Sequence, residues 1–250
     1  MYLREEQPTN TKIQRKKIEK DIFDSWIEKI NDFLDYRYDN EADYFTYWNL
    51  QNKIKDDKIQ LNGKIFDCLK VFGEIADKCW MYGHFKDDSE KTFCIGYYGP
   101  IIYIKSVKTV CEYQFGFNEK GIYLSTHFKY SNNIRYMGDD FWKLLLSLSE
   151  FEGFSYFENQ KVSSKIEKEY SELFASNKSL IFRMLRKYFF DVTIDDYDKN
   201  SYLGELEIAY SPKTDFPEII ENFCQGFKIM YRLNYMLWKV SDLKKKMRLE

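Results

Sequence analysis

Apolar residues recur at helical spacing through the first eighty residues of the chain. They fall three or four residues apart, while Glu, Asp and Lys occupy the remaining faces, which is typical of amphipathic helices. The pattern predicts three helices, over residues 12–35, 41–55 and 64–83. Gly83 stands where a left-handed residue would end the third helix. Residues 11–83 are therefore expected to form a helical layer.

After Phe85 the apolar period shortens to two, which is the spacing of β-strands. Short runs rich in Ile, Val, Tyr and Phe predict four strands, over residues 92–98, 101–107, 110–117 and 122–129. The last two are joined by the polar residues 118–121 and predict a hairpin. If Phe117 faces Ile122, one face of the hairpin is apolar and the other polar. A slip of one residue would turn the apolar set toward water, so the pattern determines this register.

The remainder mixes helices with one further hairpin. Helices are expected from Asp139, Ser164 and Ser179, each of which can cap a helix N-terminus. A hairpin is predicted from strands over 191–194 and 202–210, and a long last helix from Asp215 to about Lys244.

The predicted elements indicate the α+β class. We expect a flexible tail over residues 1–10 and one domain over 11–250, divided into the helical layer 11–83 and a sheet-containing remainder, 84–250. In this domain an antiparallel sheet of hairpins, about 92–130 and 191–210, packs between the N-terminal helical layer and the C-terminal helices.

Composition narrows the class of protein. The 250 residues are 44% hydrophobic and 31% charged with a net charge of -2, which argues against a disordered or membrane protein and gives no overall field for nucleic acid. The five cysteines are scattered without a CxxC pair, which favours neither a disulfide framework nor a zinc site. With no secretory signal pattern, these features predict a cytoplasmic protein. No nucleotide-binding or zinc motif occurs, so no cofactor is expected.

Aromatic residues make up 19% of the chain, with 21 Tyr, 21 Phe and 5 Trp. Such rings can build a core, and an excess of Tyr often lies at protein interfaces. A coding sequence rich in A and T would favour the same residues whatever the function. Both explanations stay open at the level of sequence.

The polar face of the predicted hairpin carries the main catalytic candidates, His127 and Glu112. A carboxylate opposite an imidazole could orient it and raise its pKa, as a general acid or base requires. The candidate binding residues on this and the preceding strand are Tyr123, Lys129, Tyr103 and Lys105. The alternative is an exposed Glu–His pair that contributes a fraction of a kcal/mol to the sheet.

Carboxylates concentrate in the second predicted hairpin, at Asp195, Asp196, Asp198, Glu205 and Glu207. Such groups can hold Mg²⁺ or Ca²⁺, but the loop lacks the spacing of an EF-hand. We therefore interpret it as a solvated acidic turn and assign no metal site.

Basic residues cluster at both ends of the chain, over 12–20 and 239–248. If the ends lay together they could bind nucleic acid, whereas lysines at a helix C-terminus also simply complement its dipole.

Two hypotheses of function follow. The first is a non-enzymatic intracellular protein of the inhibitor, immunity or anti-defence type, which binds another macromolecule, expected to be a protein, through an aromatic-rich surface. The second is a phosphodiester hydrolase or nuclease that uses the His–Glu pair or an acidic metal site. The sequence leans away from an enzyme and determines neither the partner nor the oligomeric state.

Overall fold

The computed structural model describes residues 10–53, 62–158, 180–193 and 203–247. The chain divides into two compact units, Met1–Val71 and Phe72–Glu250, with the boundary inside the third helix. The single domain predicted for residues 11–250 stays a prediction. The predicted tail lies almost entirely outside the described residues.

The N-terminal helices form as the apolar pattern indicates. They are α1 (Asn10–Asp39), α2 (Glu41–Lys53) and α3 (Gly63–Gly83). On α1 the stripe of Trp26, Ile30 and Phe33 is buried, and the ring of Phe33 meets Tyr44 of α2 edge-on at 5.9 Å. A turn at Asn40 separates the two helices, where the Asn40 side chain donates a hydrogen bond to the carbonyl of Tyr36.

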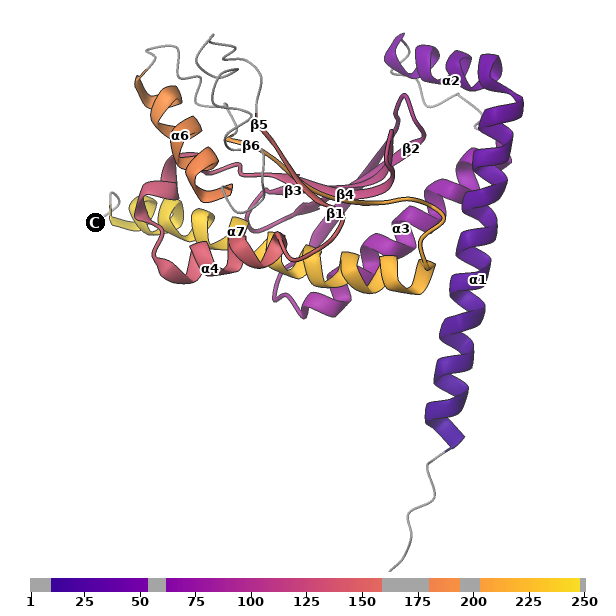
Figure 1. Ribbon diagram of the computed structural model, residues 1–250, viewed down its shortest axis with the longest axis horizontal. Coiled ribbons are helices and arrows are strands. Elements are labelled where there is room, and N and C mark those ends of the chain that lie inside the picture. Colours follow the sequence, from indigo (N-terminus) through magenta and orange to yellow (C-terminus); the bar gives the residue numbers. More distant parts are fainter. Residues whose placement is uncertain (1–9, 54–61, 159–179, 194–202, 248–250) are drawn as a thin grey trace, which may run out of the picture. The chain divides into compact units, whose positions relative to one another are not determined.

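One antiparallel sheet of six strands forms the centre of the second unit, which confirms the α+β class (Figure 1). Its strands are β1 (Ser89–Ile95), β2 (Pro100–Ser106), β3 (Glu112–Asn118), β4 (Gly121–His127), β5 (Phe154–Glu158) and β6 (Gly204–Tyr210). Their spatial order is β1-β2-β3-β4-β6-β5, so β1 and β5 are the edges of the sheet.

The predicted register of the β3–β4 hairpin is confirmed. Phe117 faces Ile122 and Phe115 faces Leu124. The turn is shorter than predicted, because pairing continues to Asn118 and Gly121. The Asn118 side chain accepts hydrogen bonds from the backbone N–H groups of Lys120 and Gly121, and Gly121 has a φ of 130°, a conformation that favours glycine.

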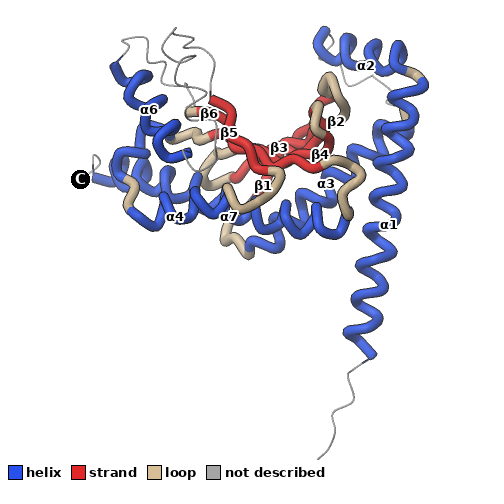
Figure 2. The backbone as a smooth tube through the Cα atoms, viewed as in Figure 1, coloured by secondary structure: helices blue, strands red, loops and turns tan. Residues whose placement is uncertain are grey.

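The apolar face of the sheet is covered by helices. The longest is α7 (Phe216–Met247), whose Phe223 ring lies 6.2 Å from Phe115, while Phe72 of α3 lies 5.0 Å from Phe117. Phe115 and Phe117 share one face of β3, so these helices lie on the same face of the sheet. Figure 2 shows α4 (Asp139–Leu148) beside α7 on that face.

Two local predictions need correction. Residues 191–193 are the end of α6 (Leu180–Thr193) and not a strand, and β6 pairs with β4 and β5 instead. A short apolar run does not distinguish a strand from a helix by period alone, which is why residues 191–193 are open to either assignment from sequence. The left-handed residue after α3 is His84, with a φ of 50°, rather than Gly83. The helix predicted from Ser164 lies outside the described residues.

Candidate functional site

The second face of the sheet is polar and carries the residues that the sequence singled out. Successive strand residues point to opposite faces, so the strand pairings place one row of side chains across all six strands. This row consists of Thr92, Tyr103, Gln114, Ser125, Glu207 and Ser155. The sequences of β3 and β4 predict the middle of this row of side chains. The continuation of the row onto β6 depends on pairing between strands that are far apart in the chain.

His127 lies between two carboxylate-bearing strands. On β6 its partner is Glu205. On β3 the register ends with Tyr113 opposite Thr126, so the next residue of β3, Glu112, is the neighbour of His127 on the other side. Thr126 donates a 2.7 Å hydrogen bond to the carbonyl of Glu112, which holds this end of the hairpin together. His127 is half-buried and Glu112 exposed. Glu205 is the neighbour that sequence reasoning missed, because β4 and β6 are far apart in the chain.

The candidate binding residues lie at different register positions relative to His127. Tyr123 is buried, donates to Gln114 at 3.4 Å and is separated from His127 by Ser125 on the same face of β4. Lys129 lies beyond the end of β4 and donates to the carbonyl of Val110.

The other two candidates lie on β2. Tyr103 is half-buried, and burial raises the pKa of its phenol, as it does for Tyr123. Lys105 pairs with Glu112 across β2 and β3. The face thus offers a histidine beside carboxylates. Tyr103 lies one row of side chains away from His127, and Tyr123 lies two rows away. The catalytic role of His127 stays a prediction.

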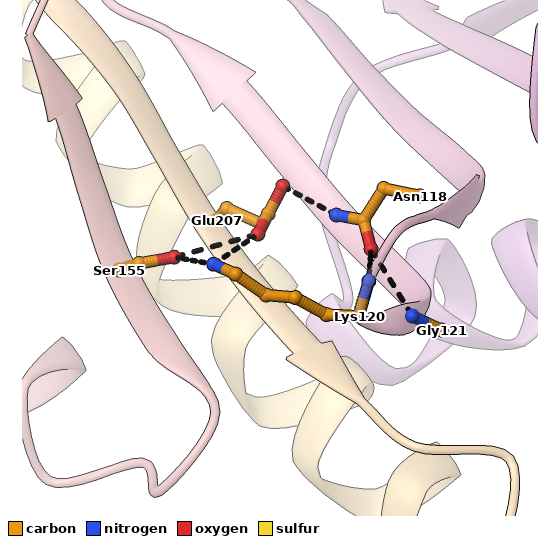
Figure 3. A network of polar contacts seen from close by, with 5 residues as sticks. All are labelled: Asn118, Lys120, Gly121, Ser155 and Glu207. Atoms are coloured by element: carbon orange, nitrogen blue, oxygen red, sulfur yellow. Dashed lines mark hydrogen bonds and ion pairs between the residues drawn. The ribbon is translucent and has the colours of Figure 1, made fainter.

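Glu207 is the centre of a buried polar network on the same face (Figure 3). Its side chain is 8% exposed and accepts hydrogen bonds from Asn118 at 2.8 Å and Lys120 at 3.1 Å. Ser155 of β5 lies 3.4 Å from the same carboxylate and 3.0 Å from the Lys120 ammonium. Because both carboxylate oxygens are engaged, this glutamate joins the β3–β4 turn to β5 and β6, which is a structural role.

The acidic hairpin proposed from sequence is only partly described. Asp195, Asp196 and Asp198 lie outside the described residues, while Glu205 and Glu207 are on β6. Within the part of the chain that the structure describes, no group of three or more His, Cys, Asp or Glu side chains is arranged to hold a metal ion.

Many of the described aromatic residues have a structural explanation, because they are buried and build the core. Phe227 of α7 is fully buried and lies within 6 Å of four other rings, those of Trp80, Phe85, Tyr113 and Phe115. The informative aromatic residues are therefore those that remain at the surface.

A group of surface aromatic residues lies on the β1–β2 hairpin at the sheet edge. Phe93 is 58% exposed, and Tyr97 and Tyr98 of the turn are 49% and 37% exposed. The two tyrosine rings meet edge-to-face with centroids 5.0 Å apart. We call these three residues the edge aromatic group.

The backbone of β1 presents hydrogen-bonding groups at the same edge. The backbone N–H of Gly96 donates to the carbonyl of Gly99, and that of Val107 donates to the carbonyl of Asp88. The backbone N–H and C=O groups of the even-numbered residues of β1 therefore point toward β2. In an antiparallel pair the alternate residues point their N–H and C=O groups the other way. The backbone N–H and C=O groups of Lys91 and Phe93 therefore point away from β2, where the described strands provide no partner.

The terminal basic clusters are described only in part. At the C-terminal end Lys246 pairs with Asp242 at 2.7 Å, and Lys244 donates to Asn133. The side chains over residues 12–18 lie outside the description and the two units are not placed relative to each other. Binding of nucleic acid stays a prediction.

Comparison of the chain with protein-family models, with curated proteins and with solved structures finds no match. None of the described helices is long and apolar enough to span a bilayer.

Proposed function

We propose that this chain is a protein-binding module that accepts an extended segment of a partner protein at strand β1. One observation carries the proposal: the outward backbone groups of Lys91 and Phe93 and the edge aromatic group lie on the same hairpin. Both are features through which an added strand gains affinity and specificity.

The physical basis is strand addition. An extended segment can form main-chain hydrogen bonds with an edge strand, while alternate side chains supply specificity. Aromatic side chains are common anchors of such contacts, because they bury large areas with few rotatable bonds. The partner segment should therefore carry apolar side chains at every second position on the face of Phe93.

Binding of this kind is how an inhibitor, immunity or anti-defence protein would act on its target. We propose the cytoplasm as its location, since the five cysteines are free thiols and would stay reduced there.

A backbone variant tests the mode of binding. Lys91→Pro removes an outward N–H group without breaking the ladder to β2, because proline is tolerated at an edge strand. Its matched control, Lys91→Ala, loses only the exposed 2.6 Å ion pair with Asp77. With the chain as bait in an extract of its native cell, a partner held by the wild type and by Lys91→Ala should be lost with Lys91→Pro.

A side-chain variant tests the aromatic contribution. Replacing Phe93, Tyr97 and Tyr98 together with serine should also release the partner, whereas Tyr38→Ser, which changes an 88% exposed residue on α1, should not. The purified partner should slow amide hydrogen exchange over residues 89–98. Equal capture by all variants, or protection confined to other segments, would contradict the proposal.

The position of His127 between Glu112 and Glu205 favours one alternative, a phosphodiester hydrolase. In that case His127→Ala should abolish hydrolysis of a generic phosphodiester while leaving the melting temperature nearly unchanged. A wild type without hydrolytic activity, or an active His127→Ala variant, would rule this alternative out.

A further inference from the structure

A pocket of about 730 Å³ lies between α6 and the segment formed by η1 (Ser131–Tyr136) and α4. Its walls include Ile134, Met137, Trp142, Ile181, Leu185 and Arg135. Pockets for small molecules commonly enclose about 300–1,000 Å³ and are mostly apolar with a few polar groups. The size and the lining both match that description, and the pocket uses elements other than the β1 edge.

The apolar wall from α6 follows from its sequence pattern. Leu180 and Met184, four residues apart, are buried and fix the helix to the rest of the unit. Ile181 and Leu185 are shifted by one position, are half-exposed and face the pocket. On the opposite wall the Trp142 indole N–H donates to the carbonyl of Met137 at 3.2 Å, which fixes the orientation of the ring.

The charge at the pocket is positive. Arg135 is the charged residue among the described lining residues, and its guanidinium lies 4.8 Å from the ring centre of Tyr136. The Lys244 ammonium lies 4.1 Å from the same ring. Burial acts to raise the pKa of Tyr136, but these two cations outweigh it and lower that pKa, as a positive local potential requires.

We propose that this pocket binds an amphiphile with an anionic head group, whose apolar chain lies against Leu185 and Trp142 and whose head lies at Arg135. An apolar pocket beside a cation complements such a molecule in both of its parts. The inference is independent of the proposed function, because the β1 edge contributes no residue to the pocket.

A chain-length series tests the apolar part. Octanoate, decanoate and dodecanoate, each below its micelle concentration, are titrated into the full chain by calorimetry. Burial of each added methylene should tighten binding by about fourfold. Leu185→Asp should weaken binding of decanoate by at least about tenfold, because it places a carboxylate in the pocket. Phe182→Asp is the matched control on the same helix, since Phe182 is 66% exposed and not part of the lining, and it should bind as the wild type does.

Head-group variants test the charged part. Arg135→Glu should weaken decanoate by at least about tenfold and leave decanol unchanged, whereas Arg135→Lys should retain binding of decanoate within about threefold. Decyl phosphate beside decanoate distinguishes a phosphate-bearing lipid from a free fatty acid as the source of the head group. Circular dichroism of every variant confirms that it is folded.

Three results would overturn the inference. One is the absence of saturable binding of either decanoate or decyl phosphate to the wild type. Another is equal affinity of Leu185→Asp and wild type for decanoate. The third is that the wild type binds no ligand but forms a dimer, seen by light scattering, which Leu185→Asp dissociates. In that case a second copy of the chain would cover the pocket.

Discussion

Glu207→Gln should destabilise the second unit by removing one negative charge from the network in Figure 3. The substitution keeps the shape of the side chain, so packing is little changed. In the wild type the carboxylate accepts hydrogen bonds from Asn118, Lys120 and Ser155. Glutamine has one acceptor oxygen, and its amide nitrogen would face at least one of these donors.

The magnitude follows from burial and from the partners. Hydrogen bonds to a charged group are worth about 1.5–3 kcal/mol when the partner is lost. The Lys120 side chain is 40% exposed, so water screens the ion pair and its own share is below about 1 kcal/mol. We therefore expect Glu207→Gln to lower the free energy of unfolding by about 2 kcal/mol, or the melting temperature by about 4–8 °C.

Urea unfolding followed by circular dichroism measures this free energy, and a double-mutant cycle with Lys120→Met separates the ion pair. Lys120→Met alone should cost about 0.5 kcal/mol. Amide exchange should also accelerate in β5, because Ser155 loses its carboxylate neighbour. A loss below about 0.5 kcal/mol for Glu207→Gln, the range of ordinary surface substitutions, would refute the view that this carboxylate joins the turn to β5 and β6.

Three further predictions concern the core. Mild oxidation should link Cys79 of α3 to Cys224 of α7, whose sulfur atoms lie 3.6 Å apart, and peptide mapping without reduction should detect the disulfide, which Cys224→Ser must abolish. Phe227→Ala should cost about 3–5 kcal/mol in urea unfolding, because it leaves a cavity among four rings; a loss under about 1 kcal/mol would contradict this packing. Burial raises the pKa of Cys111 to about 11, so the thiol ionises at lower pH in the unfolded chain, and stability should fall as pH rises from about 9 to 11. Cys111→Ala should flatten this decline in a series of urea titrations, and an unchanged slope would exclude the thiol as a cause.

Local sequence patterns predicted the parts of the fold that neighbouring residues determine. The alternation of residues 111–128 determined the β3–β4 register, because any slip would expose the apolar face. Helical spacing likewise located α1, α3 and α7 within a few residues. The same reasoning identified His127 and Glu112 as candidates for adjacent positions, since they belong to one hairpin.

Contacts between distant segments determined the rest. The insertion of β6 between β4 and β5 brought Glu205 to His127 and Glu207 to the β3–β4 turn, and no local pattern encodes the order of strands that are far apart in the chain. Strand order also decided that β1 is an edge, and therefore that Phe93 is exposed rather than buried. An apolar residue on a strand looks the same in sequence whether a helix covers it or not. The alternation of side chains thus follows from the sequence by itself, whereas the tertiary structure alone decides which of those side chains meet water, because burial depends on every neighbouring segment at once.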